Sequence, residues 1–179
     1  MSDVMSDLTI RPATDADWPR IWPFFDGIVQ AGETYAFPLD LTVESARSWW
    51  MEQPPSATLV AVDHDGAVLG SAKWGPNRPG RGAHVSTASF MVDPAARGRG
   101  VGRALARYVV DAARTAGYRG MQFNAVVETN TAAVALWVSL GFVVVGTVPE
   151  AFDSQTHGLV GLHVMYLPLQ DRPLTANEA

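Results

Sequence analysis

The pattern of hydrophobic positions in the second half of the chain switches between the two-residue period of strands and the longer period of helices. Val85–Val92 and Gly120–Val127 are short runs with β-branched and aromatic residues, and they predict strands. Between them, apolar residues over 100–116 recur every three to four positions, which predicts a helix that ends at Gly117. A strand, a helix and a second strand therefore follow one another here.

Similar patterns predict five further strands and three further helices. The strands are Leu8–Arg11, Thr58–Asp63, Val68–Trp74, Phe142–Val148 and Val160–Leu167. The helices begin at Thr14, whose pairing with Asp17 resembles a capping box, and after the N-caps Thr42 and Asn130, and they run to about Gly32, Met51 and Leu140. Residues 75–82, rich in glycine and proline, are predicted to form an irregular loop. We therefore expect an α/β (α+β) fold with a central, mixed but mostly antiparallel sheet of about seven strands flanked by helices.

The length of the chain fits one domain. Its 179 residues are 47% hydrophobic and 17% charged, which is enough apolar material for a sizeable core. We expect a single domain over residues 1–179, with flexible ends at 1–6 and 171–179. The chain has no cysteine, which excludes disulfides, thiolate metal sites and a cysteine nucleophile. Its histidines are too scattered to suggest a metal site.

The charge of the chain is unevenly distributed. The net charge of −5 argues against a general nucleic-acid binder. Residues 1–65 have a balance of −8, whereas residues 97–119 contain six arginines and one acid. This basic island suggests a small anionic ligand, and a solvated basic helix face is the alternative. No long apolar run or signal-like N-terminus is present, so we expect a cytoplasmic protein without membrane association.

A glycine- and arginine-rich turn lies between the strand that ends at Val92 and the helix over 100–116. Three glycines here remove side chains where a ligand could approach the backbone, and the first N–H groups of a helix attract anions. The turn therefore has the character of a pyrophosphate cradle. It is not a P-loop, because Arg103 stands where that motif needs lysine. It also lacks the glycine spacing of a dinucleotide fold.

Two blocks of the chain resemble the GNAT superfamily of N-acetyltransferases. Arg97-x-x-Gly100-x-Gly102 is similar to the acetyl-CoA pyrophosphate loop of that superfamily. The block that begins at Asn130 and continues through Ala133 and Trp137 to Gly141-Phe142 is similar to its second conserved segment. The resemblance spans roughly 8–169 and implies acetyl-CoA as co-substrate, held where two strands of the sheet splay apart.

The resemblance also implies which residues hold the cofactor. Backbone groups of the strand end and of the glycine turn would contact the pantetheine arm and the pyrophosphate, and Asn130 would bond the pantetheine arm. The implied acetyl-CoA-binding residues are Phe90, Met91, Val92, Arg97, Gly98, Arg99, Gly100, Val101, Gly102, Arg103, Asn130, Ala133 and Trp137. A plain helix N-cap is an equally good role for Asn130 and does not exclude the first.

The acid and base common among these relatives are missing from this chain. Trp137 stands where many of them have a tyrosine acid, and indole supplies no useful proton at neutral pH. Ala125 stands where ribosomal-protein acetylases have a glutamate. The candidate catalytic residues are therefore Asn124, Glu33 and Glu128, although Glu33 and Glu128 could equally be solvated acids.

The predicted acceptor site lies in the loop between the first two helices and on the strands that line the cleft. Glu33-Thr34-x-x-Phe37 resembles the corresponding stretch of phosphinothricin-type acetyltransferases, and the segment around Asn124 resembles proline-analogue (azetidine-2-carboxylate) acetyltransferases. The implied substrate-binding residues are Glu33, Thr34, Tyr35, Thr87 and Asn124.

The resemblance implies an acetyl-CoA-dependent N-acetyltransferase that acts on a small amine, an amino acid or a toxic analogue of one, by direct attack. An antibiotic or polyamine acceptor is the alternative within the class, and the acidic N-terminal third would suit such a cation. A non-catalytic acetyl-CoA sensor is the alternative outside it. The resemblance also implies a possible homodimer, because dimers are common among members of the superfamily.

Overall fold

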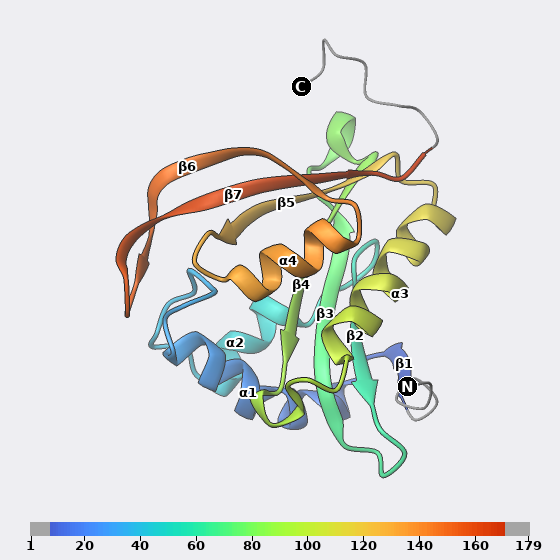
Figure 1. The fold of residues 1–179 in the computed structure, drawn as a ribbon. Helices are drawn as coiled ribbons and strands as arrows, with labels where there is room; N and C mark the ends of the chain where they lie inside the picture. Colours follow the sequence, from blue (N-terminus) through green and yellow to red (C-terminus); the bar gives the residue numbers. More distant parts are fainter. Residues whose placement is uncertain (1–7, 171–179) are drawn as a thin grey trace.

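The computed structural model describes residues 8–170 and contains one seven-stranded sheet (Figure 1). The strands are β1 (Thr9–Pro12), β2 (Ala57–Val62), β3 (Val68–Pro76), β4 (Val85–Val92), β5 (Gly120–Val127), β6 (Val143–Ser154) and β7 (Gly158–Pro168). Their order is β1-β2-β3-β4-β5-β7-β6, and every neighbouring pair is antiparallel except β4 and β5. The predicted mixed, mostly antiparallel sheet is thus confirmed.

Helices cover both faces of this sheet. They are α1 (Trp18–Gln30), α2 (Val43–Trp50), α3 (Val101–Thr115) and α4 (Thr131–Ser139). On one face, α3 and α4 bury a core with members such as Leu105, Val109, Met121, Phe123 and Trp137. On the other, α1 and α2 bury a second core with members such as Ile21, Phe25, Trp50, Val60 and Met91. This division decides which side of the sheet each strand residue faces.

Most predicted elements are confirmed, and two need correction. The predicted loop over 75–82 is partly regular, because β3 pairs with β4 as far as Pro76 and a 3₁₀ turn forms over Gly80–Gly82. The strand predicted to end at Val148 continues to Ser154. It passes Pro149 through an irregularity in the β6–β7 register, with Glu150 at φ 52°. The predicted flexible ends, 1–6 and 171–179, lie outside the described residues.

The sheet opens between its two central strands. β4 and β5 pair only at Val85–Gly120 and Ser86–Met121, after which they diverge (Figure 1). β5 keeps its other edge paired with β7. The rest of β4 therefore has one edge that faces no strand, which is the splay that the family resemblance implies.

The capping box predicted at Thr14 forms around a buried carboxylate. Asp17 accepts hydrogen bonds from the Thr14 N–H at 2.8 Å and hydroxyl at 3.0 Å, and from two nitrogens of Arg11 at 2.7 and 2.8 Å. The box opens a 3₁₀ turn that leads directly into α1. The hydrogen bonds from Arg11 hold the pKa of Asp17 far below its ordinary value.

Replacing Asp17 by alanine is expected to destabilise the protein by about 3 kcal/mol, because it removes the cap and leaves Arg11 unpaired. Since the folded-state pKa is depressed, this stabilisation is present above the ordinary pKa of 3.8 and is lost as the pH falls below it. Urea unfolding at pH 7 and at about pH 3 measures both effects. Asp15→Ala is the control, since that exposed acid should contribute less than about 1 kcal/mol. Equal losses for the two variants would contradict the prediction.

Candidate functional site

The glycine-rich turn follows the free end of β4 and opens α3. Gly98 and Gly100 have φ values of 81° and 76°, a left-handed conformation that side chains with a β-carbon rarely adopt. Nothing lies within 4 Å of the β-carbon that either residue would have. Gly100 is the N-cap of α3, so the first N–H groups of this 15-residue helix lie next to an open, side-chain-free surface.

Positive charge surrounds this turn. Arg97, Arg99 and Arg103 are all exposed. Arg99 lies 3.7 Å from the carboxylate of Asp63, at the end of β2, so part of its charge is already balanced. Arginine charge, the helix dipole and unpaired N–H groups together favour a pyrophosphate-sized anion. The residues present therefore fit the CoA pyrophosphate.

The open edge of β4 contacts the loop between α1 and α2. The hydroxyl of Tyr35 donates to the carbonyl oxygen of Phe90 at 2.7 Å and accepts from its N–H at 3.1 Å. Burial raises the pKa of this phenol. The backbone groups of Phe90, which the family resemblance assigns to the pantetheine arm, are thus already hydrogen-bonded to Tyr35.

Strand alternation leaves Val92 as the next open backbone position. The Asp93 N–H donates to the carbonyl oxygen of Leu69 on β3 at 2.9 Å. The backbone N–H and C=O of Met91, two residues earlier, therefore also point toward β3. Met91 is buried and pairs with Ser71 in the sheet register. The backbone groups of Val92 point to the same open edge of β4 as those of Phe90, so the Val92 N–H is directed toward the splay. Of the predicted pair Met91 and Val92, only the second has its backbone groups on the open edge.

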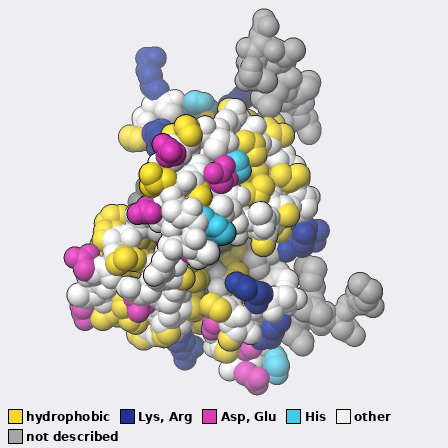
Figure 2. Space-filling view, turned by 60° about the vertical axis from the view of Figure 1, so that its left-hand side comes forward, with side chains coloured by type: hydrophobic (Ala, Val, Ile, Leu, Met, Phe, Trp, Pro, Cys, Tyr) yellow, Lys and Arg dark blue, Asp and Glu magenta, His cyan; other side chains and the backbone are white. Residues whose placement is uncertain are grey.

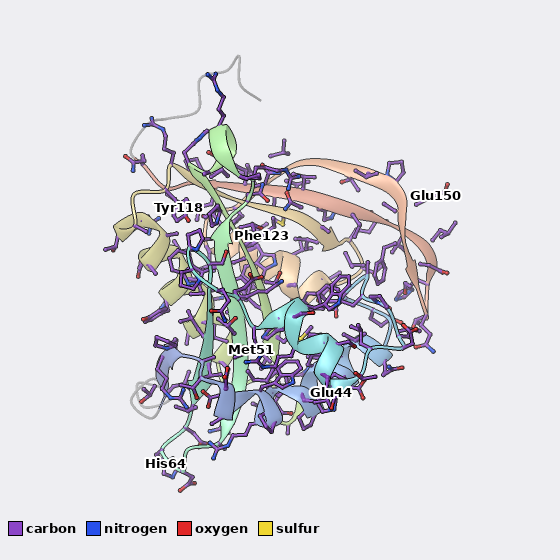
Figure 3. All side chains as sticks on the ribbon, turned by 180° about the vertical axis from the view of Figure 1, so that it is seen from behind. Glu44, Met51, His64, Tyr118, Phe123 and Glu150 are labelled. Atoms are coloured by element: carbon purple, nitrogen blue, oxygen red, sulfur yellow. The ribbon has the colours of Figure 1, made fainter. Side chains whose placement is uncertain are left out.

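An aromatic cluster closes the α4 side of the opening. The ring of Trp137 lies 5.0 Å from that of Phe90 and 4.8 Å from that of Phe123, centroid to centroid. Phe123 lies in the interior of the molecule (Figure 3). Trp137 is 7% exposed and packs as part of the core. Asn130 caps α4, because its side-chain oxygen accepts from the N–H of Ala133, another candidate cofactor-binding residue, at 3.3 Å. The predicted capping role of Asn130 is thus confirmed.

A chain of three amides lies on the opposite face of the sheet. The amide nitrogen of Asn124 donates to Asn77 at 2.6 Å, and its oxygen accepts from Gln122 at 2.8 Å. Met121 and Phe123 belong to the α3–α4 core, so alternation places Asn124 on the other side of β5. Ala88 and Phe90 pack against that same core, so Thr87 also faces the side of Asn124. The predicted pair Thr87 and Asn124 thus shares one face of the sheet.

Glu33 is bonded to the tip of the β6–β7 hairpin. One carboxylate oxygen accepts from the Ser154 hydroxyl at 2.6 Å. The other accepts from the Thr156 N–H at 2.8 Å and hydroxyl at 2.6 Å. These hydrogen bonds, that from Ser154 first, lower the pKa of Glu33. The adjacent Thr34 has a buried hydroxyl without a hydrogen-bond partner in the described part of the chain.

Glu128 lies at the end of β5 and is exposed. One of its oxygens accepts from the N–H of Gly161 at 2.5 Å, across the β5–β7 pair. Near it, the Thr147 hydroxyl and the His163 ring nitrogen Nδ1 are 2.7 Å apart. The structure therefore brings Glu128 to the hairpin strands rather than to Glu33, and the two candidate acids have separate surroundings.

The structure adds participants that sequence reasoning missed. Asn77 bonds Asn124, and Ser154 and Thr156 bond Glu33, although neither group carries a motif. The only available signal for Asn77 was its position in the Gly-Pro loop.

Within residues 8–170 no group of three or more acids or histidines could hold a metal ion, and His64 lies at the tip of the β2–β3 turn (Figure 3). None of the described helices is long and apolar enough to cross a membrane.

Comparison with known proteins gives consistent matches. Residues 21–142 match the family model described as "Acetyltransferase (GNAT) family". The L-methionine sulfoximine/L-methionine sulfone acetyltransferase of Pseudomonas aeruginosa is 33% identical over 147 residues, which cover 79% of this chain and 84% of that protein.

Solved structures agree with this match. A GCN5-related N-acetyltransferase from Kribbella flavida is 64% identical with a TM-score of 0.89, over 92% of this chain and 99% of that one. A phosphinothricin acetyltransferase from Sinorhizobium meliloti in complex with acetyl-CoA is 25% identical with a TM-score of 0.81, over 95% of each chain. The fold and the two motif blocks therefore match the same group of proteins, the acetyltransferases.

Proposed function

The chain belongs to the GNAT family of acetyltransferases, and we propose that it transfers the acetyl group of acetyl-CoA to the amine of an amino acid or a toxic amino-acid analogue. The observation that carries this proposal is the glycine turn, with open positions at Gly98 and Gly100, at the end of the unpaired edge of β4. The Pseudomonas aeruginosa relative, named for methionine sulfoximine and methionine sulfone, supports the acceptor class.

The residues around the splay divide the work of holding acetyl-CoA, which supplies the thioester when it is bound. Backbone N–H groups of Gly98 and of residues 100–103 would hold the pyrophosphate, with Arg97 and Arg103 adding charge, whereas the Arg99 N–H donates to Ala96 at 3.2 Å. Asn130, Ala133 and Trp137 would line the α4 side. The N–H of Val92, on the open edge, would stabilise the negative charge that develops on the carbonyl oxygen of the thioester.

We assign the acceptor side of the splay to Asn124, Thr87 and the loop that carries Thr34 and Tyr35. Asn124 would orient the acceptor through its amide, because an amide cannot take a proton from an amine. Glu128, with one carboxylate oxygen bonded to Gly161, would accept the amine proton through water.

Thermal unfolding with acetyl-CoA tests this function, with CoA and ATP as comparison ligands. At 100 times Kd, a ligand that binds the native state stabilises it by about 2.7 kcal/mol, which is about 5 °C or more for a domain of this size. A panel of amines, assayed by release of free CoA thiol, then distinguishes amino-acid analogues from polyamines and antibiotics. No shift with acetyl-CoA would refute the proposal, and binding without turnover of any amine would favour a sensor.

We also propose that two copies associate along β6, which is an edge strand with apolar side chains in solvent. Val145 is 64% and Val148 53% exposed, and the part of the molecule that carries the hairpin shows hydrophobic side chains in Figure 2. An open edge with such side chains favours pairing with another chain. A second copy of the chain offers the same surface, and it would pair with the open edge of β6 and cover its exposed valines.

Replacing Val145 and Val148 together by lysine is expected to convert a dimer into a monomer, because charge on an edge strand opposes pairing. Size-exclusion chromatography with light scattering measures the mass in solution. Leu39→Lys is the matched control, since Leu39 is 60% exposed on a loop outside the hairpin. A monomeric wild type, or a dimeric double variant, would contradict this interface.

A further inference from the structure

Glu33 and its neighbour Gly32 are fastened to a segment more than a hundred residues away. Besides the three hydrogen bonds to the Glu33 carboxylate, the carbonyl oxygen of Gly32 accepts from the N–H of Gln155 at 3.1 Å. Gly32 has φ 65°, and a β-carbon there would lie 3.2 Å from Gln155. Residues 32–33 and 154–156 thus form a close contact, which we name the clasp. In Figure 1 the hairpin tip reaches down to the loop after α1.

The carboxylate in the clasp is poorly suited to take a proton. Both of its oxygens accept short hydrogen bonds from hydroxyl or N–H donors, at 2.6–2.8 Å. Such donors stabilise the charged form, which agrees with the lowered pKa of Glu33. A general base needs a pKa nearer the working pH and an accessible lone pair. The geometry therefore gives Glu33 a different task.

The clasp and a second set of hydrogen bonds hold the first part of the loop over residues 31–42, between α1 and α2, which we call the acceptor loop. Two residues further on, the Tyr35 hydroxyl bonds both backbone groups of Phe90 on β4. Between the attachments lies Thr34, whose buried hydroxyl has no partner among the described residues. Fixing both sides of Thr34 removes conformational freedom that acceptor binding would otherwise have to remove, so the loop is preorganised for its ligand.

We propose that Glu33 is a positioning residue that clasps the acceptor loop to the β6–β7 hairpin and so sets the affinity for the acceptor. This inference rests on the proposed acetyl transfer. Breaking the clasp raises the KM of the acceptor, leaves kcat nearly unchanged and does not affect acetyl-CoA binding. The hairpin tip, although it belongs to the far end of the chain, is then part of the acceptor site.

A double-mutant cycle distinguishes this role from that of a base. Glu33→Ala breaks the clasp from the loop side because it removes all three acceptor contacts, and Ser154→Ala with Thr156→Val breaks it from the hairpin side. Thr156→Val alone, at an exposed position, replaces the double change if that variant fails to fold. Asp153→Asn, an exposed carboxylate of the same hairpin, is the matched control. Kinetics with the best amine of the panel, the Kd of acetyl-CoA and hydrogen exchange of amides 31–37 are measured for each.

The expected result is the same for both sides of the clasp. Each variant raises the acceptor KM about tenfold or more, with kcat within about threefold, and the combined variant is no worse. Amides 31–37 exchange faster in each, whether or not the amine is known. A large fall in kcat for Glu33→Ala that the hairpin variant does not share would overturn the inference and make Glu33 a base. Unchanged exchange would overturn it as well. Failure of the wild type to bind acetyl-CoA would refute only the proposed function.

Discussion

Replacing Gly102 by leucine is expected to weaken acetyl-CoA binding at least about 100-fold, a loss of about 2.7 kcal/mol, without lowering Tm. Gly102 lies in the first turn of α3, where a β-carbon would lie 3.5 Å from Val92 and 3.8 Å from Leu136. These are ordinary contacts, so the fold accepts a β-carbon at this position. A leucine side chain would extend beyond that β-carbon, between Val92 and Leu136, and would take up space beside the first N–H groups of α3, which are available to the pyrophosphate.

Gly27→Leu is the matched control for this experiment. Gly27 also lies within a helix, α1, and nothing is within 4 Å of the β-carbon it would have. Leucine favours a helix over glycine by about 0.8 kcal/mol, so both variants should keep or slightly raise Tm. Calorimetric titration with acetyl-CoA then separates the two positions. If Gly102→Leu kept the affinity of the wild type, the turn would not be the cradle.

Local signals explain why this part of the site could be predicted from the sequence. The glycine turn, the Asn130 cap and the strand that ends at Val92 are each specified by residues within one short window. Chain order then places the cradle at the end of β4. The splay follows from the position of β4 beside β5, which the family resemblance implied and strand pairing confirmed.

The rest of the site depends on contacts between distant parts of the chain, which no local window reports. Ser154 lies 121 residues from Glu33, and Phe90 lies 55 residues from Tyr35. The second half of β6 was missed because Pro149 signals an end, whereas the register irregularity near Glu150 lets pairing with β7 continue. That missed half ends at Ser154 and leads into the turn that carries Thr156, and these two residues are the partners of Glu33. The sequence could therefore name the glutamate but not its surroundings.

Asn124→Ala is expected to lower kcat/KM for the acceptor about 100-fold while the Kd of acetyl-CoA stays within about threefold of that of the wild type. The amide of Asn124 is held from two sides, by Asn77 at 2.6 Å and Gln122 at 2.8 Å. An amide held in this way loses little conformational entropy when it binds a polar group of the acceptor. Removing it therefore removes nearly the whole binding free energy of that contact. Steady-state kinetics and calorimetric titration measure the two quantities.

Asn77→Ala completes this argument, because Asn77 acts through Asn124. Its loss should leave the contact with the acceptor intact but less well oriented, and a fall of about tenfold in kcat/KM is expected. In the combined variant the second change should add almost nothing, since the amide that Asn77 orients is gone. Gln53→Ala, an exposed amide between α2 and β2, is the control. Full activity in Asn124→Ala would remove the amide chain from the acceptor site and leave that site to the clasped loop.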